Sequence, residues 1–428
     1  MTRESKVALI GILDDGWAGL NDAARQRIGA ADLVIGATRT LELVRPHVAP
    51  GSTLQSMDGA LGQVPQWLQA AHAQQRNTVV LATGDPLCHG LAAWLRDKAG
   101  VPLEIMPNLS TLQLACARWQ ETWDDIAIAS CHTRDAGEWH ADATPEHGLY
   151  PAMRAIARNE RVFLFTSEAN SPARIARALL TAGYDSDEVT IAVAARLQLP
   201  DESIETGLSL EAAAVTEFAQ PNVMLVTRKD SERRATFGFD DLDFVQRSPD
   251  KGLITKQEAR AVSLAKLALR ADDTVWDIGA GAGSVGLEAA RLVPHGHVWA
   301  IEKNADDAAN ARHNAVRLRA TNYTLVDGKA PQHLDQWPAP NAVFIGGSSG
   351  KLDALITLIL DRLQPGGRLV MNFVTLENMA TAVAILNACN ADWDCLQLQA
   401  SRSQPILDMH RMAAQNPVWI ITASKAQT

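Results

Sequence analysis

The stretch Trp276-Asp277-Ile278-Gly279-Ala280-Gly281-Ala282-Gly283-Ser284 decides the fold of the second half of the chain. An apolar run over 274–278 leads into three alternating glycines, and residues 285–292 then have helical periodicity. Glycine permits a sharp turn and lets a ligand lie against bare backbone. The helix N-terminus behind such a loop presents free N–H groups and the positive end of a dipole. This strand–loop–helix order predicts a ligand site at one edge of an α/β sheet.

An acidic residue at the end of the next expected strand indicates that this ligand is a nucleoside. The apolar run 298–301 ends at Glu302, about 20 residues after the loop, where a carboxylate can accept both ribose hydroxyls. Gly281, Gly283 and Gly286 also fit the GxGxxG pattern of dinucleotide enzymes. A nicotinamide-dependent oxidoreductase therefore stays an alternative at this point.

Two further features favour S-adenosylmethionine over a nicotinamide. Pro365-Gly366-Gly367-Arg368 is a turn typical of folds that use S-adenosylmethionine, and Asp327-Gly328 after the third strand suits an adenine edge. Thr255 has two interpretations, because with Glu258 three residues later it forms a capping-box pattern. A helix N-terminus at this place could also hold the methionine carboxylate, and both interpretations stay open.

Apolar runs alternate with helical periodicity along nearly the whole chain, which predicts an α/β protein. In the first half we expect strands at 7–12, 78–82, 103–106, 126–129, 162–166, 189–194 and 223–227. In the second half we expect seven strands, at 274–278, 298–301, 323–326, 342–345, 368–373, 395–399 and 418–422. Helices are expected between the first five of these, and the last two are expected to pair as an antiparallel hairpin. The charged run 228–234 has no apolar stripe and indicates a linker.

The composition limits the classes of function. The chain has 428 residues, of which 39 are basic and 49 acidic, so its net charge is −10. An acidic chain without a basic run is a poor match to nucleic acid, and no apolar stretch approaches the ~18 residues of a membrane span. The cysteines show no metal-ligand spacing, so no metal site is predicted. We expect them to be reduced core residues of a cytoplasmic protein, at 88, 116, 131, 389 and 395.

Several motifs of the second half resemble the decarboxylating precorrin-6B C15-methyltransferases of cobalamin biosynthesis. These motifs are Gly252-Leu253-Ile254-Thr255-Lys256-Gln257-Glu258-Ala259-Arg260, the glycine loop, Gly328-Lys329-Ala330-Pro331, Val343-Phe344-Ile345-Gly346-Gly347 and Asn372-Phe373-Val374-Thr375-Leu376-Glu377. The first half resembles the tetrapyrrole methylases that act at C-5 of precorrins. Its motifs are Ala82-Thr83-Gly84-Asp85-Pro86, Pro107-Asn108-Leu109-Ser110-Thr111-Leu112-Gln113-Leu114-Ala115, His132-Thr133-Arg134 and Phe165-Thr166-Ser167. In this order the two halves resemble the fused, decarboxylating precorrin-6Y C5,15-methyltransferases.

The resemblance implies an α/β fold of two different kinds. Residues 1–228 would form a bilobed tetrapyrrole methylase fold with its lobes divided near residue 107. After a linker at 229–247, residues 248–428 would form a seven-stranded, Rossmann-like class I methyltransferase fold. The implied activity is methylation of C-5 and C-15 of precorrin-6B with loss of the C-12 acetate carboxylate, which gives precorrin-8X. The resemblance also implies S-adenosylmethionine at two sites and a homo-oligomer.

The expected binding residues follow from the loop and from the resemblance. In the second half they are Thr255, Asp277, Gly279, Ala280, Gly281, Ala282, Gly283, Glu302, Asp327 and Ala330. In the first half they are Gly84, Asp85, Pro86, Ser110 and Thr111. The candidates for catalysis are Asp85, His132, Arg134 and Lys256. Since the substrate carries several carboxylates, we expect basic residues in the clefts, with the candidates Arg118, His132, Arg134, Lys256 and Arg260.

The first half departs from the tetrapyrrole methylase pattern at two places. Asp14-Asp15 replaces a Pro-Gly step of the first turn, and Cys88-His89 occupies a place where an aromatic residue is common. Three alternatives to a bifunctional methyltransferase stay open. The chain could be a nicotinamide-dependent oxidoreductase, or a single methyltransferase with a non-catalytic first half. An RNA methyltransferase is disfavoured by the acidic balance.

Overall fold

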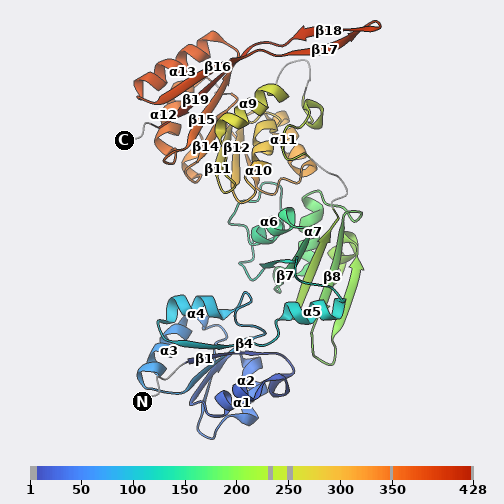
Figure 1. The fold of residues 1–428 in the computed structure, drawn as a ribbon, viewed down its shortest axis with the longest axis vertical. Coiled ribbons are helices and arrows are strands. Elements are labelled where there is room, and N and C mark those ends of the chain that lie inside the picture. The colour runs from blue at the N-terminus through green and yellow to red at the C-terminus, as the bar shows by residue number, and fades with distance from the viewer. Residues whose placement is uncertain (1–6, 230–234, 248–253, 348–349, 426–428) are drawn as a thin grey trace. The chain divides into compact units, whose positions relative to one another are not determined.

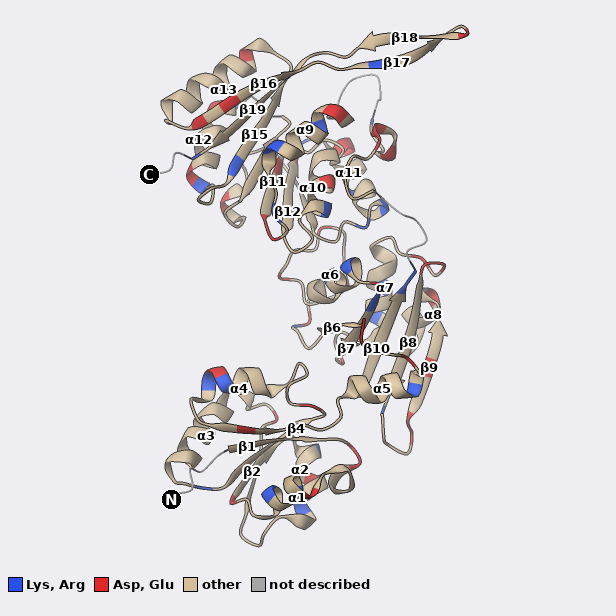
Figure 2. Cartoon of the chain, in the orientation of Figure 1, with Lys and Arg blue, Asp and Glu red and all other residues tan. Residues whose placement is uncertain are grey.

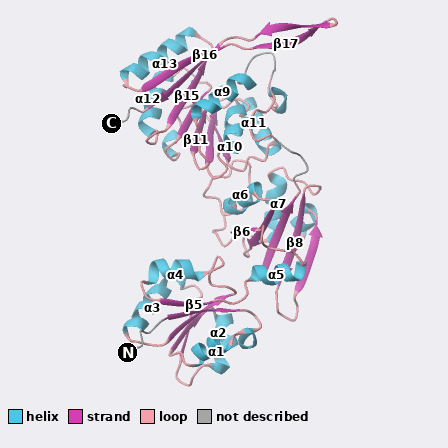
Figure 3. Cartoon of the chain, viewed as in Figure 1, coloured by secondary structure: helices cyan, strands magenta, loops and turns pink. Residues whose placement is uncertain are grey.

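The computed structural model of the chain describes residues 7–229, 235–247, 254–347 and 350–425. The expected start of the second domain at residue 248, and Gly252 and Leu253 of the quoted motif, lie outside these residues. Helices and strands alternate through the described chain (Figure 3), so the α/β prediction is confirmed. The chain divides into two compact units. The first contains Met1–Thr133, Asn159–Arg174 and Val189–Arg228, and the second contains Arg134–Arg158, Ile175–Glu188 and Lys229–Thr428.

The first sheet of the first unit is entirely parallel, with the strand order β3-β2-β4-β1-β5. Its strands are β1 (Val7–Ile12), β2 (Leu33–Gly36), β3 (Thr53–Ser56), β4 (Thr78–Thr83) and β5 (Leu103–Met106). Its helices are α1 (Asp22–Gly29), α2 (Thr38–Val44), α3 (Val64–Ala73) and α4 (Leu91–Ala99). Side chains alternate across each strand, so Leu9 of β1 packs with α3 and α4 while Ile10 packs with α1 and α2.

The second sheet of the first unit is mixed, with the order β6-β7-β10-β8-β9. The pair β6–β7 is parallel and the other pairs are antiparallel. Its strands are β6 (Ala127–Ser130), β7 (Arg161–Phe165), β8 (Val189–Ala195), β9 (Ser203–Leu208) and β10 (Asn222–Arg228). The helices of this part of the chain are α5 (Thr111–Trp119), α6 (Tyr150–Arg158), α7 (Pro172–Thr181) and α8 (Leu210–Val215). Of these, α6 and most of α7 belong to the second unit.

A seven-stranded sheet forms the centre of the second unit, in the order β13-β12-β11-β14-β15-β19-β16. Its strands are β11 (Thr274–Ile278), β12 (His297–Glu302), β13 (Tyr323–Asp327), β14 (Ala342–Ile345), β15 (Arg368–Phe373), β16 (Asp392–Leu398) and β19 (Val418–Ser424). The first five are parallel, and β19 is antiparallel to both β15 and β16. The described α-helices that follow Lys229 are α9 (Gln257–Leu267), α10 (Ser284–Leu292), α11 (Ala305–Arg317), α12 (Leu352–Arg362) and α13 (Leu376–Ala388).

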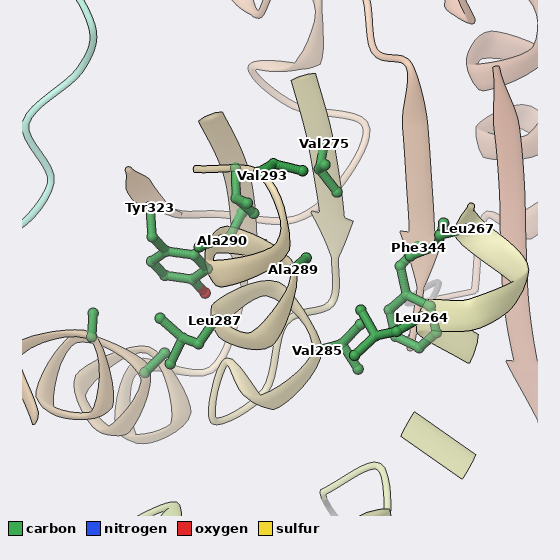
Figure 4. Packing of buried hydrophobic residues seen from close by; sticks show 14 of the residues in the cluster. Leu264, Leu267, Val275, Val285, Leu287, Ala289, Ala290, Val293, Tyr323 and Phe344 are labelled. Atoms are coloured by element: carbon green, nitrogen blue, oxygen red, sulfur yellow. The ribbon is translucent and has the colours of Figure 1, made fainter. Parts of the chain in front are cut away.

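Helices cover both faces of this sheet (Figure 1). Neighbouring residues of each central strand point to opposite sides, and the apolar residues on both sides are buried beneath helices. Val275 lies in a buried cluster with α9, α10 and α11, while Trp276 lies in a cluster with α12 and α13. Figure 4 shows part of the first cluster, in which the side chains of Leu264, Val285 and Phe344 lie close together.

The end of the second half contains a feature that the sequence did not predict. The connection between β16 and β19 forms a two-stranded antiparallel ribbon, β17 (Ser401–Ile406) and β18 (Met409–Ala414), which extends from the sheet in Figure 1. Most of its side chains are exposed, including Leu407 at 94% and Met412 at 66%. Its apolar and polar residues alternate too weakly to indicate a strand.

Other predictions of secondary structure differ from the structure. All seven expected strands of the second half are present, but between β13 and β14 the described chain has only a short 3-10 helix at Leu334–Gln336. In the first half β2, β3 and β9 were not predicted. The strands β2 and β3 have only four residues each, and most residues of β9 are exposed, so none of them shows a clear periodic pattern of apolar residues. Cys389 and Cys395 are exposed and not core residues, since Cys389 caps α13 and Cys395 lies on the edge strand β16.

Residues 235–247, expected within a solvated linker, are packed into the second unit. Phe239 and Phe244 are buried in the cluster with α9 and α10. The same segment supplies Asp241 to a buried ion-pair network centred on Arg260, whose side chain is fully buried. The Arg260 guanidinium contacts Asp241 at 3.2 Å and Glu288 at 2.5 Å. Arg260 therefore holds the domain together, and the expectation that it contacts substrate carboxylates is wrong.

Candidate active sites

The glycine loop of the second unit joins β11 to α10 in a conformation that side chains would obstruct. Gly279 has φ +70°, and a Cβ there would lie 2.6 Å from the carbonyl oxygen of Gly347. At Gly286, in the first turns of α10, a Cβ would lie 2.8 Å from the ring of Tyr323. Glycine is needed at both positions because the backbone approaches neighbouring chain so closely. The loop thereby places its backbone at the carboxyl ends of β11 and β12.

Asp277 lies beneath this loop and is 1% exposed. Its Oδ2 accepts a hydrogen bond of 3.0 Å from the backbone N–H of Gly286, which ties the strand to α10. Burial raises the pKa of the Asp277 carboxyl to about 7, although the Gly286 hydrogen bond opposes this shift. The other oxygen, Oδ1, has no hydrogen-bond partner among the described residues. Asp277 therefore fixes the position of α10 relative to β11, and with it the conformation of the loop between them.

Glu302 ends β12 and faces a cavity of about 100 Å³ beside the loop. The cavity is lined by Gly279, Ile301, Glu302, Lys303, Gly328, Ala330 and Gly347. The Glu302 carboxylate accepts hydrogen bonds of 2.9 Å from the Gly281 N–H and 2.8 Å from the Asn304 N–H. A carboxylate has about four lone-pair positions, so each oxygen can accept one more hydrogen bond from a ligand in the cavity.

Three of the ten expected binding residues of the second half line this cavity, and two others contact or pair with Glu302. Gly279, Glu302 and Ala330 line it, Gly281 binds Glu302, and Asp327 is paired with Glu302 in the β12–β13 ladder. Ala280 and Ala282 instead hold the loop, because the Ala280 N–H donates to Ile301 O and Ala282 O accepts from Asn314. Gly283 caps α10 with φ +81°.

Thr255 and Lys256 lie at the start of α9, and neither lines this cavity. The capping-box prediction is wrong, because Lys256 occupies the N-cap position without a side-chain cap. Glu258 instead binds Arg402 through two hydrogen bonds of 2.7 Å, which lower the pKa of its carboxyl. The Lys256 ammonium lies 4.0 Å from Asp241, and Thr255 O accepts from Arg260. Both residues thus join the ion-pair network of this helix.

A second, larger cavity of about 350 Å³ lies within the first unit. It is bordered by residues at or just after the carboxyl ends of parallel strands, namely Leu13 and Asp14 after β1, Arg39 after β2 and Thr83 of β4. Thr111 and Leu114 of α5 and several residues of the second sheet complete it. Ligands of open α/β sheets bind at such strand ends. The position therefore supports a ligand site.

The lining of this cavity includes one aspartate, one arginine and two histidines. Asp14 forms an ion pair with Arg39, and burial lowers the pKa of Arg39. His89 and His132 also line the cavity, and burial lowers the pKa of His132. In Figure 2 the basic residues of the described chain are scattered over many elements. This cavity gathers Arg39, which is paired with Asp14, and two histidines whose ring N–H groups can donate hydrogen bonds to a ligand.

The residues expected from the first half have varied positions. Thr111 and His132 line the cavity, and Ser110 caps α5 in a capping box with Gln113. Gly84, Asp85 and Pro86 form the turn between two lining residues, Thr83 and Cys88. Asp85 holds this turn by accepting a 2.9 Å hydrogen bond from the Leu87 N–H.

Two of the expected basic residues lie elsewhere. Arg118 forms an ion pair with Glu202, at 2.5 Å. Arg134 belongs to the second unit, where it donates to the carbonyl of Glu146 at 2.8 and 3.1 Å. Neither residue lines the first cavity. Arg39 lines it and was missed, because β2 was not predicted and its position at a strand end could not be inferred.

The described residues contain neither a cluster of metal-ligating side chains nor a helix that could span a membrane. No group of three or more His, Cys, Asp or Glu side chains there could hold a metal ion. None of the described helices combines the length and apolar character needed to cross a membrane.

Comparison with known proteins gives a different match for each half. Residues 248–425 match the precorrin methyltransferase domain, and residues 6–213 match the tetrapyrrole (corrin/porphyrin) methylases. The cobalt-precorrin-6B C(15)-methyltransferase (decarboxylating) of Salmonella typhimurium is 40% identical over 177 residues, which are 41% of this chain and 90% of that protein. The chain belongs to the precorrin methyltransferase family. It is therefore an S-adenosylmethionine-dependent methyltransferase.

One relative spans both halves of this precorrin methyltransferase. The precorrin-6Y C(5,15)-methyltransferase [decarboxylating] of Sinorhizobium sp is 28% identical over 419 residues, which are 94% of this chain and 92% of that protein. Among solved structures, the precorrin-6Y C5,15-methyltransferase of Geobacter metallireducens is 40% identical and aligns with a TM-score of 0.43. That alignment covers 45% of this chain and 97% of the other.

The residues at the second unit's cavity fit the nucleoside part of the methyl donor. Glu302 offers free lone pairs to a ribose, and the bare backbone of the loop lets a ligand approach. The cavity of about 100 Å³ is smaller than the ~300–1,000 Å³ of most ligand sites, so its volume fits a part of such a ligand and not the whole. The cavity of the first unit, about 350 Å³, lies within that range.

Proposed function

We propose that this chain is a bifunctional methyltransferase that methylates C-5 and C-15 of precorrin-6B and removes the C-12 acetate carboxylate, giving precorrin-8X. The observation that carries the proposal is the presence of two separate cavities at strand ends, one in each compact unit. The two halves of the chain match two different methylase families, in the order found in its full-length relative.

The proposal assigns the second cavity to donor binding for the second half. Bound S-adenosylmethionine supplies an electrophilic methyl group to a carbon nucleophile. The Glu302 carboxylate accepts hydrogen bonds from the two ribose hydroxyls, and the backbone of Gly279–Gly283 lies against the donor. The Asp327 carboxylate accepts a hydrogen bond from the adenine amino group. Asp277 holds the loop from below through Gly286. We assign this part of the chain, residues 248–428, a class I methyltransferase fold.

The proposal assigns the first cavity to a second donor and to the substrate. Thr111 and the turn Gly84–Pro86 would border the donor, and Arg39, His89 and His132 would face the substrate carboxylates. We assign this activity to residues 1–228 as a bilobed tetrapyrrole methylase. Residues 229–247 then form the connection between the two activities. Asp85, His132, Arg134 and Lys256 stay candidates for catalysis.

Both reactions need alignment more than a strong base. A carbon of the reduced macrocycle attacks the methyl group in line, so much of the rate comes from orientation. The ring nitrogen becomes cationic as that carbon bonds, and a nearby carboxylate would stabilise it. In the decarboxylation the bond between the acetate methylene and its carboxylate breaks, carbon dioxide leaves, and the electron pair enters a protonated ring imine.

We also propose that the chain acts as a cytoplasmic homo-oligomer. The ribbon β17–β18 exposes Ile406, Leu407, Met409 and Met412, and apolar side chains concentrated in this way favour contact with a second copy. Light scattering is expected to give a multiple of 46.2 kDa. A mass of one chain would contradict the proposed assembly, and recovery of the enzyme in a membrane or periplasmic fraction would contradict the location.

Titration of the full chain with S-adenosylhomocysteine tests the donor sites. We expect two binding equivalents per chain in isothermal titration calorimetry, because each unit has its own cavity. Binding of a single equivalent would favour the alternative in which the first half is a non-catalytic module. Binding of NAD in place of S-adenosylhomocysteine would overturn the proposal altogether.

A further inference from the structure

The edge strand of the seven-stranded sheet is held by two charged side chains. β13 stands at one end of the strand order. The N–H of Leu325 in this strand donates to Asp142 Oδ1 at 3.3 Å, and Leu325 O accepts from Arg312 at 3.3 Å. Because edge strands expose unpaired backbone groups, Asp142 and Arg312 together pair the groups that Leu325 would otherwise leave to solvent.

The same two side chains form an ion-pair chain that ends on Asp327. Arg312, on α11, contacts Asp142 Oδ2 through Nε at 2.7 Å. Its two terminal nitrogens contact the two oxygens of Asp327 at 3.1 and 2.9 Å. The hydrogen bonds to Asp327 and then Asp142 raise the pKa of Arg312. A planar guanidinium held at three nitrogens fixes the orientation of the carboxylate that it binds.

Asp327 is connected in turn to the cavity beside the glycine loop. It pairs with Glu302 in the β12–β13 ladder, and the next residue, Gly328, donates its N–H to Glu302 O at 2.9 Å. Gly328 and Glu302 both line the cavity. Each oxygen of Asp327 accepts one hydrogen bond from Arg312 and keeps lone pairs for a ligand. A shift of Arg312 would therefore be transmitted to the cavity wall.

We propose that Asp142 is a positioning residue for the methyl donor of the second half. Through Arg312 it orients Asp327, whose carboxylate accepts a hydrogen bond from the adenine amino group. Asp142 belongs to the second compact unit, yet it falls in the range 6–213 that matches the tetrapyrrole methylases. Donor affinity in one half of the chain thus depends on a residue from the sequence of the other half. This inference rests on the proposed donor site at Glu302.

The test measures donor affinity in the full chain. Asp142→Ala and Asp142→Asn are titrated with S-adenosylhomocysteine, and the site of the second half is identified as the one lost in Glu302→Ala. We expect affinity at that site to fall about three- to tenfold in both variants, because the charged hydrogen bond to Arg312 Nε is lost. Affinity at the site of the first half should not change.

The asparagine variant separates positioning from stability. Its side-chain oxygen can still accept from the Leu325 N–H, so we expect its melting temperature to stay close to that of the unmodified chain. Glu146→Gln is the matched control, because it removes one negative charge from the same segment and Glu146 makes no ion pair with the described residues. Its affinity should equal that of the unmodified chain.

The outcomes distinguish the inference from the proposed function. Unchanged affinity in Asp142→Asn overturns the positioning role, whether or not Asp142→Ala folds. A fall in affinity that occurs equally in Glu146→Gln also overturns it, since the effect would then be one of overall charge. If Glu302→Ala keeps both binding equivalents, the proposed donor site itself is wrong.

Discussion

A chain in which Glu302 is replaced by alanine is expected to methylate its substrate once and to release no carbon dioxide. The Glu302 carboxylate lines the cavity of the second unit and is the residue there that can accept both ribose hydroxyls. Loss of two hydrogen bonds to a charged group, at about 1.5–3 kcal/mol each, corresponds to a fall of about 100-fold or more in the second activity. Product masses and S-adenosylhomocysteine titration measure the effect.

The first half of the same chain serves as the internal control. The reciprocal variant Thr111→Met is expected to fill part of the first cavity and to remove the other methylation, with carbon dioxide release retained. Thr122→Met, at an exposed position that does not line the cavity, is the matched control for that variant. If Glu302→Ala abolished both methylations equally, the assignment of one donor site to each half would be contradicted.

Replacement of Arg260 by alanine is expected to destabilise the second unit by about 3–5 kcal/mol. Arg260 is fully buried and pairs with Glu288, whose side chain is 1% exposed, and with Asp241. Without the guanidinium the Glu288 carboxylate is left buried without a cation. Two backbone carbonyls, of Thr255 and Phe239, also lose their donor. Thermal unfolding is expected to show a melting temperature lower by roughly 6–20 °C.

Two further variants test the cause of this loss. Arg402→Ala removes a partly exposed arginine from the same network, and its expected cost is about 1 kcal/mol. The double replacement Arg260→Met with Glu288→Met removes both charges of the buried pair and should cost less than Arg260→Ala alone. An Arg260→Ala chain as stable as Arg402→Ala would show that the buried charges are not what holds α9 and α10 to residues 238–244.

Local patterns were sufficient to predict the centre of the second half. The strand before the glycine loop, the loop itself and the helix after it lie where the sequence placed them, because apolar periodicity and glycine spacing are local signals. The same signals placed Glu302 at the end of the neighbouring strand. The structure adds that Glu302 shares a cavity with Gly279 and Ala330.

Features that depend on distant partners could not be predicted in this way. Arg260 stands in a helical sequence like any surface arginine, and only the fold shows that two acids from elsewhere enclose it. Arg39 was missed because β2 has only four residues, too few for a periodic signal. Residues 134–158 lie within the first half in sequence, but their contacts place them in the second unit. Which distant residues contact one another depends on the whole fold, and a short stretch of sequence does not contain that information.

The product mass from the full chain shows whether each half of the chain carries out one methylation. Precorrin-6B and S-adenosylmethionine are incubated anaerobically with the enzyme, and the product is weighed by mass spectrometry. For the unmodified chain we expect a gain of two methyl groups and a loss of one carbon dioxide. For the Glu302→Ala chain we expect a gain of one methyl group and no loss of carbon dioxide. A product from the unmodified chain with a single added methyl group would contradict the assignment of one methylation to each half.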